Sequence, residues 1–263
     1  MKCPSDMARC NFMPLSPTAT HPHPAGFTLL ELLVVISIIL ALAALALPVF
    51  NHQQLQSRKV VALHMMRQLG TALEIHVAQN DNNLPDEGSV SENSWSYASD
   101  PTNTKCWFNA LPRLLEMKPM SAFAGNPAAF YTKENLLYLP GATYPAGGAR
   151  LIKPLYAVGI NSKLQRRDAS GNKAFVNKNN IQSPSKTVLF LERGLPSEKR
   201  AMPTIPPYDG APKASPNAFV ARHSKKGVLT FVDGHAASVE ASEILDAAGN
   251  VRLPPSSDII WSL

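Results

Sequence analysis

Residues 26–31 read Gly26-Phe27-Thr28-Leu29-Leu30-Glu31, and the apolar run LLVVISIILALAALAL follows directly over Leu32–Leu47, with Ser37 its only polar residue. The segment from Phe27 to Phe50 has 24 residues, which as a helix with a rise of 1.5 Å per residue would be about 36 Å long. Because the hydrocarbon core of a bilayer is about 30 Å thick, residues 27–50 are predicted to form a transmembrane helix.

One carboxylate, Glu31, lies near the amino end of this predicted helix. A charged side chain at the centre of a bilayer costs about 2.5–3.5 kcal/mol, so ionisable residues in membrane helices usually have a function and a partner. Glu31 is therefore predicted to pair with a positive charge. The alternative interpretation is an interfacial residue that faces lipid headgroups.

The segment before the helix differs from an ordinary secretory signal. A signal peptide places its apolar region before a small-residue cleavage site, whereas here Ala25 and Gly26 precede the apolar run. A cut after Gly26 would leave the helix on the mature protein. Residues 1–26 are therefore predicted to be a leader that is removed, and Met7 and Met13 also allow a later start.

The hexapeptide at 26–31 and the LLVVISII that follows resemble the type III signal of type IV pilins and type II secretion pseudopilins. In that family a prepilin peptidase cuts after the glycine on the cytoplasmic side and N-methylates the new amino terminus. The resemblance implies cleavage after Gly26 and methylation at Phe27. It also matches the family's glutamate to Glu31 and its helix-kinking proline to Pro48.

Processing and assembly are linked in this interpretation. In a filament, the acid of one subunit can pair with the amino terminus of a neighbour, because an unpaired charge in an apolar core is costly. The free amino group at Phe27 exists only after cleavage. For Pro48, a kink within the helix and a simple helix end both remain open.

The resemblance implies a single-pass protein of the inner membrane whose soluble part is exported to the periplasm or cell surface. Its expected partners are the prepilin peptidase, other pilin or pseudopilin subunits and inner-membrane lipid. Leaders of this family usually carry Lys or Arg close to the cut, where this chain has His21-Pro22-His23-Pro24. The positive-inside rule therefore gives little support for a cytoplasmic amino end. The orientation follows from the resemblance.

The helical pattern continues beyond Pro48. Apolar residues recur at intervals of three, four and seven from Leu55 to Val77, which is typical of an amphipathic helix with one buried face. The polar stretch Asn80–Pro85 ends the pattern. One long helix is predicted over residues 27–80, in lipid for its first half and packed on a soluble domain for its second half.

Residues 81–263 are predicted to form an exported globular α+β domain. Short strand-like runs separated by turn residues favour a pilin-like fold, with the long helix packed on an antiparallel β-sheet. A last short helix is predicted over Ser242–Ala248, capped by Ser242. The predicted strands are Leu136–Leu139, Leu155–Ile160, Thr187–Leu191, Phe219–Ala221, Val228–Val232 and Ala236–Val239.

A carboxyl-terminal hairpin is predicted over residues 223–240. Asp233-Gly234 is a strong turn signal between two strand-like runs. His223, nine residues and then Asp233-Gly234 resemble the H-X9-DG element at the carboxyl end of one large group of pilin-like proteins.

Two roles are open for His223, Asp233 and His235. These side chains could converge on a metal ion. Alternatively, Asp233 accepts backbone hydrogen bonds in its own turn while His223 braces the hairpin. The structural role is favoured because Ca²⁺ requires several oxygen ligands and the nearby acids are few. No cofactor is expected.

Composition narrows the function further. The net charge is +6 and the pI is about 9.3, but the basic residues are scattered, so nucleic-acid binding is not expected. Cys106 is the one cysteine after the apolar run and is predicted to be a buried thiol. The sequence has no G-x-S-x-G, H-E-x-x-H or Walker glycine loop.

Two classes of function remain. The first is a filament subunit without chemistry of its own, in a type IV pilus or a type II secretion pseudopilus. The second is a membrane-anchored exported enzyme or binding module that uses the helix only as an anchor. The first is favoured because a plain anchor needs neither Glu31 at its apolar edge nor a glycine before an aromatic residue.

Overall fold

The computed structural model describes residues 26–88, 93–164, 166–167, 170 and 173–263, without the side chains of 45–52, 149–150, 166–167 and 173. The predicted leader, residues 1–26, lies outside this part of the chain except for Gly26. Internal contacts divide the chain into two units, residues 1–49 and 50–263. Each unit is described separately below.

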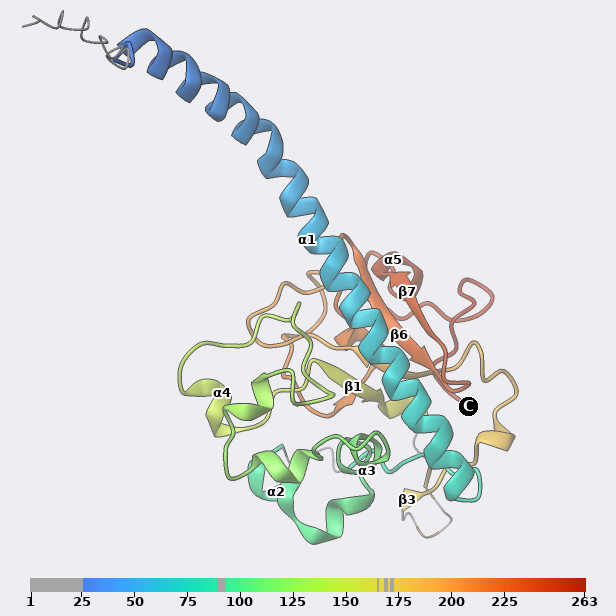
Figure 1. The fold of residues 1–263 in the computed structure, drawn as a ribbon. Helices are drawn as coiled ribbons and strands as arrows, with labels where there is room; N and C mark the ends of the chain where they lie inside the picture. The colour runs from blue at the N-terminus through green and yellow to red at the C-terminus, as the bar shows by residue number, and fades with distance from the viewer. Residues whose placement is uncertain (1–25, 89–92, 165, 168–169, 171–172) are drawn as a thin grey trace, which may run out of the picture. The chain divides into compact units, whose positions relative to one another are not determined.

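The amino-terminal element is α1, a 51-residue helix from Leu29 to Gln79 (Figure 1). The long helix expected from the sequence is thus confirmed. Pro48 lies within α1, so its interpretation as a helix end is wrong. No helix in the described part of the chain combines the length and the apolar character required to cross a bilayer.

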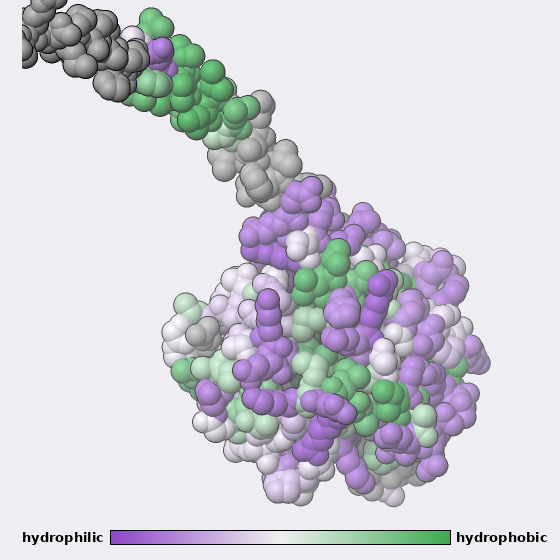
Figure 2. Space-filling model, in the orientation of Figure 1, coloured by the Kyte–Doolittle hydropathy of each residue, from purple (hydrophilic) through white to green (hydrophobic). Residues whose placement is uncertain are grey.

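In the first unit, every described side chain from Phe27 to Ala44 is exposed. The run contains large apolar residues, and Figure 2 shows them as a continuous apolar surface along the helix. Leu29 is 82% exposed and Leu40 is 68% exposed. No described residue of the first unit covers this surface.

The second unit is built on a five-stranded sheet with the order β5-β1-β4-β6-β7. β1 pairs antiparallel with β4, β4 with β6, and β6 with β7, whereas β1 and β5 run parallel. The sheet is therefore mixed, and the prediction of an antiparallel sheet is wrong for its β5 edge. Its strands are β1 Val158–Asn161, β4 Val188–Glu192, β5 Lys213–Ala214, β6 Lys226–Phe231 and β7 Ala236–Glu240. A separate pair joins β2 Arg166–Arg167 to β3 Lys173–Ala174.

The parallel edge has a topological cause. A parallel pair needs a crossover connection rather than a tight turn, and the proline-rich segment after β4 supplies it. β5 has only two residues, so no alternating pattern marks it in the sequence. The strand predicted at Leu136–Leu139 is also wrong, because Leu136 and Leu137 lie in a turn and the next two residues are irregular.

The carboxyl-terminal half of α1 packs on one face of this sheet, as Figure 1 shows where it crosses β6. Met66, Leu69 and Leu73 are fully buried, and the Thr230 hydroxyl on β6 donates to the Met66 carbonyl over 2.9 Å. The opposite face is covered by carboxyl-terminal segments that include Tyr208 and Trp261. The sheet therefore has a core on both faces.

Short helices and turns between α1 and β1 complete the helix-side core with a cluster of aromatic rings, among them Trp107, Phe108 and Phe130. The predicted last helix is shorter than expected, because α5 covers Ala241–Ile244 and Glu240 rather than Ser242 caps it. The remaining helices are α2 Trp95–Ser99, α3 Trp107–Leu114 and α4 Ala149–Ile152, with 3₁₀ turns at Pro101–Lys105, Met120–Phe123, Ala129–Tyr131, Ser162–Leu164, Lys178–Asn180 and Pro216–Ala218.

Candidate functional site

A capping box formed by Thr28 and Glu31 closes the amino end of α1. The backbone nitrogen and the hydroxyl of Thr28 donate to Glu31 Oε2 over 2.8 and 2.9 Å, and the Glu31 nitrogen donates to the Thr28 hydroxyl over 3.2 Å. These bonds satisfy backbone donors that the first turn of a helix leaves unpaired. Glu31 therefore stabilises its own helix, a role that our sequence reasoning missed although T-x-x-E is the signature of a capping box.

Gly26 and Phe27 lie just before the helix in exposed chain. Phe27 is 74% exposed, and, apart from the two neighbours of Gly26, no described residue lies within 4 Å of the position where its side chain would begin. The bond between these two residues therefore lies outside any helix or strand and is not covered by side chains of the described chain.

The capping box and the exposed Gly26–Phe27 bond fall in one recognised segment. Residues 23–47 match the prokaryotic N-terminal methylation motif. This match supports a prepilin-type protein. The methylation motif contains Gly26, Phe27 and Glu31, and Pro48 follows its last matched residue. No curated protein and no solved structure matches the chain.

The carboxyl-terminal hairpin places His223 and Asp233 apart. β6 and β7 pair antiparallel from Lys226↔Glu240 to Thr230↔Ala236. His223 precedes β6 and Asp233 follows it, so the strand holds them at opposite ends. They do not converge on one metal site, and the described residues contain no cluster of three or more potential metal-ligating side chains.

His223 is buried and anchors the start of β6. Its Nε2 lies 3.1 Å from Glu192 Oε1, and the other oxygen of Glu192 accepts a hydrogen bond from the Val228 nitrogen over 3.0 Å. Glu192 is fully buried on β4. It therefore links β4 to β6 through two contacts, and no pattern in the sequence points to this role.

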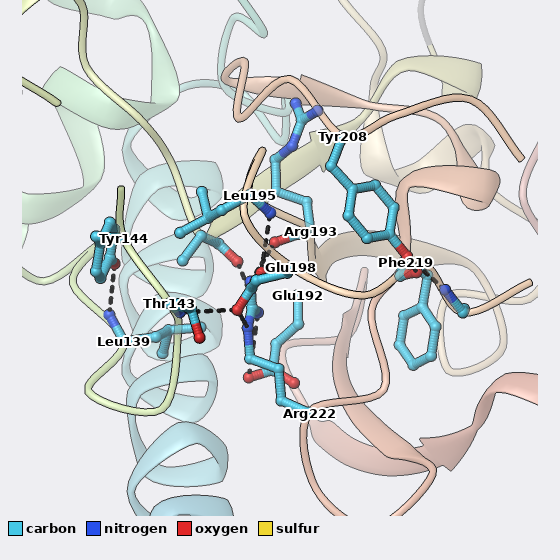
Figure 3. Close-up of polar contacts among 12 residues, drawn as sticks. Leu139, Thr143, Tyr144, Glu192, Arg193, Leu195, Glu198, Tyr208, Phe219 and Arg222 are labelled. Carbon is cyan, nitrogen blue, oxygen red and sulfur yellow. Dashed lines mark hydrogen bonds and ion pairs between the residues drawn. The ribbon is translucent and has the colours of Figure 1, made fainter. Parts of the chain in front are cut away.

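Beside Glu192, Arg222 and Glu198 form a buried two-point ion pair (Figure 3). Arg222 Nε and Nη2 donate to the two Glu198 oxygens over 2.8 and 2.5 Å. Burial by itself lowers the pKa of Arg222, but the hydrogen bonds and charges of Glu198 and Glu192 outweigh it and raise that pKa. Glu198 also accepts from the backbone nitrogens of Thr143 and Leu195, each over 2.9 Å. The pair thus joins three loops and explains how two opposite charges are buried together.

At the other end of β6, Asp233 accepts hydrogen bonds within its own turn. Its Oδ1 lies 3.2 Å from the His235 nitrogen and 2.6 Å from His235 Nδ1. The His235 ring stacks on Phe231 with a centroid distance of 4.3 Å. This geometry favours the structural interpretation of Asp233 and His235.

The turn at Gly234 is also where the sheet meets the backbone of α1. Gly234 has φ +85°, and a Cβ on Gly70 would lie 1.9 Å from the Gly234 carbonyl oxygen. Only a residue without a side chain at position 70 allows this approach. Gly70 is not among the residues predicted from the sequence, although an isolated glycine within a helical pattern is the available signal.

We expect Gly70→Ala to destabilise the second unit despite the better helix propensity of alanine. Propensity favours alanine by about 1 kcal/mol, whereas forcing a methyl group into a packed contact costs about 1–3 kcal/mol and sometimes more. The clash is with backbone rather than with a flexible side chain, so the upper end of that range is expected. Thermal unfolding of the full chain followed by circular dichroism measures the effect. Gly125→Ala, where no atom lies within 4 Å of the new Cβ, is the control and should leave the transition unchanged.

We expect His223→Ala to lower stability by about 1–3 kcal/mol, because a buried carboxylate oxygen of Glu192 loses its hydrogen-bond partner. Urea unfolding of the full chain measures this loss. The variant His235→Ala removes a half-exposed imidazole from the same hairpin and should cost less than 1 kcal/mol. Equal effects of the two variants would contradict the anchoring role of His223.

Proposed function

We propose that this protein is a prepilin-like structural subunit that is cleaved after Gly26, N-methylated at Phe27 and assembled into a type IV pilus or a type II secretion pseudopilus. The methylation motif over residues 23–47 carries the proposal. Glycine, aromatic residue, threonine and glutamate follow one another there in the family's order. In this proposal the protein has no catalytic activity and no cofactor.

The uncovered apolar surface of the first unit supports the proposal (Figure 2). Contiguous apolar patches beyond a few hundred Å² mark contacts with membranes or other proteins. Inner-membrane lipid would cover this surface before assembly, and neighbouring helices would cover it in a filament. Residues 81–263 would then be exported to the periplasm or cell surface.

Glu31 supports the proposal through its chemistry. Its carboxylate lies at the edge of an apolar helix, and the amino group freed at Phe27 by cleavage would supply the missing positive charge in a neighbouring subunit. Within its own chain, Glu31 Oε2 is held by Thr28. Assembly would therefore present a carboxylate whose position is already fixed by the capping box.

Intact-mass and amino-terminal peptide analysis tests this function. The protein is produced with and without a prepilin peptidase and extracted from membranes. A chain that begins at N-methylated Phe27 only when the peptidase is present is the expected result. A chain that keeps residues 1–26 in both cases would contradict the proposal and favour a membrane-anchored binding module or enzyme.

A further inference from the structure

A polar groove of about 230 Å³ lies at the carboxyl end of α1. It adjoins a smaller apolar cavity of about 60 Å³, with which it shares Leu84, Asp86 and Phe175. The groove belongs to the second unit and shares no residue with the methylation motif or with the buried network around Arg222. None of the contacts described above gives it a role.

Phe175 forms an apolar wall of this groove and is 61% exposed. Its backbone is nevertheless held in place, because the Leu84 nitrogen donates to the Val176 carbonyl over 2.9 Å and the Lys178 nitrogen donates to the Asn82 carbonyl over 2.8 Å. Val176 is buried while Phe175 faces the groove. An exposed aromatic ring is a surface on which the apolar face of a ligand can stack.

The polar lining is rich in amides that are themselves held in position. Asn80 Nδ2 donates to the His76 carbonyl over 2.8 Å, and Asn83 Oδ1 accepts from Asn177 Nδ2 over 3.3 Å. Each side-chain amide offers both donors and an acceptor. A pocket that combines an aromatic wall with a few convergent polar groups is typical of small-molecule sites.

The charges of the lining argue against a strongly charged ligand. Among the described residues of the lining, the carboxylates of Asp81 and Asp86 are accompanied by the ammonium group of Lys105. Burial lowers the pKa of His76 and so favours its neutral imidazole. The two carboxylates would repel a phosphate, and the lysine ammonium group would repel a polyamine.

We propose that this groove binds a neutral saccharide unit, which stacks one ring face on Phe175 and hydrogen-bonds through its hydroxyls to Gln79, Asn80 and Asn83. An oligosaccharide presents such alternating apolar faces and neutral hydroxyls. That the ligand is an extracellular or cell-wall glycan rests on the proposed function, since only an exported domain would meet it. Binding itself does not depend on processing at Gly26.

The test uses the full chain in lipid nanodiscs, because glycoside detergents would compete for the groove. Saturation-transfer NMR and calorimetry are run with the hexasaccharides of glucose, N-acetylglucosamine and mannose, and with inorganic phosphate and spermine as charged probes. Saturable binding of at least one hexasaccharide is expected, with at least a tenfold loss of affinity in Phe175→Ala and retention in Phe175→Trp. Leu253→Ala removes a similarly exposed apolar side chain, 57% exposed, and should bind like the parent.

The proposal is overturned if no hexasaccharide binds, if Phe175→Ala binds like the parent, or if only phosphate or spermine binds. Thermal unfolding shows whether each variant is folded. Because the binding assay does not use the prepilin peptidase, its failure is distinguishable from failure of the proposed function, which is read from the mass of the amino terminus.

Discussion

Gly26→Val should abolish processing, so that the chain keeps all 263 residues when it is produced with a prepilin peptidase. In the parent protein, removal of 26 residues leaves 237. The physical reason is steric, because the peptidase must bring its catalytic groups close to the backbone at the cut and a β-branched side chain hinders that approach. Intact mass and the first amino-terminal peptide distinguish the two products directly.

The surroundings of Gly26 allow this substitution to be tested without disturbing the fold. Apart from its two neighbours in the sequence, no described residue lies within 4 Å of a Cβ placed on Gly26, and Gly26 does not have a positive φ. The substitution should therefore leave the fold unchanged, which thermal unfolding can verify. Gly125→Val, also at a glycine with open space around it, is the control and should be processed normally. Mature-sized protein from Gly26→Val would show that the cut lies elsewhere.

Glu31→Gln should insert into the membrane and be processed, yet fail to enter filaments. A glutamine at this position of a capping box can still bond to the backbone of the capping residue, so α1 keeps its first turn. The variant lacks the negative charge that would pair with the amino terminus of a neighbouring Phe27. In an apolar surrounding that amino group would then be left unpaired. Removing one partner of a buried ion pair costs about 3–5 kcal/mol.

Thr28→Val is the matched control for this experiment. It removes the hydroxyl that bonds to Glu31 and weakens the cap, at a cost of about 1 kcal/mol, but it keeps the carboxylate. Incorporation is measured by the fraction of protein in sheared filaments relative to the membrane fraction. We expect incorporation near the parent level for Thr28→Val and none for Glu31→Gln. The reverse order would mean that Glu31 acts through its helix cap rather than through a charge pair.

The H-X9-DG spacing acquires a physical meaning in this fold. The nine residues between His223 and Asp233 contain a two-residue turn, in which Ser224 and Lys225 have positive φ, and then β6. His223 bonds to Glu192 at one end of this strand, and Gly234 contacts Gly70 at the other end. Residues 223–234 thus run along β6, with a contact to β4 at one end and a contact to α1 at the other.

Local sequence determined the elements whose signals lie within a few residues of each other. The apolar run over Leu32–Leu47 and the helical periodicity from Leu55 to Val77 predicted α1, and Asp233-Gly234 between two strand-like runs predicted the hairpin of β6 and β7. In both cases the backbone hydrogen bonds join residues close in sequence, so periodicity and turn chemistry are sufficient. The sequence also contains the T-x-x-E capping signal at Thr28, which was not among the predictions.

Only the tertiary structure decided which distant residues meet. The parallel pairing of β5 with β1 depends on a crossover that leaves no pattern in a two-residue strand. The contact between Gly70 and Gly234 joins positions more than 160 residues apart, and the Glu192–His223 contact spans 31. Such contacts arise from packing complementarity and from the need to pair buried charges. Neither requirement appears in the local order of residues, so the anchoring role of the hairpin became evident only in the folded chain.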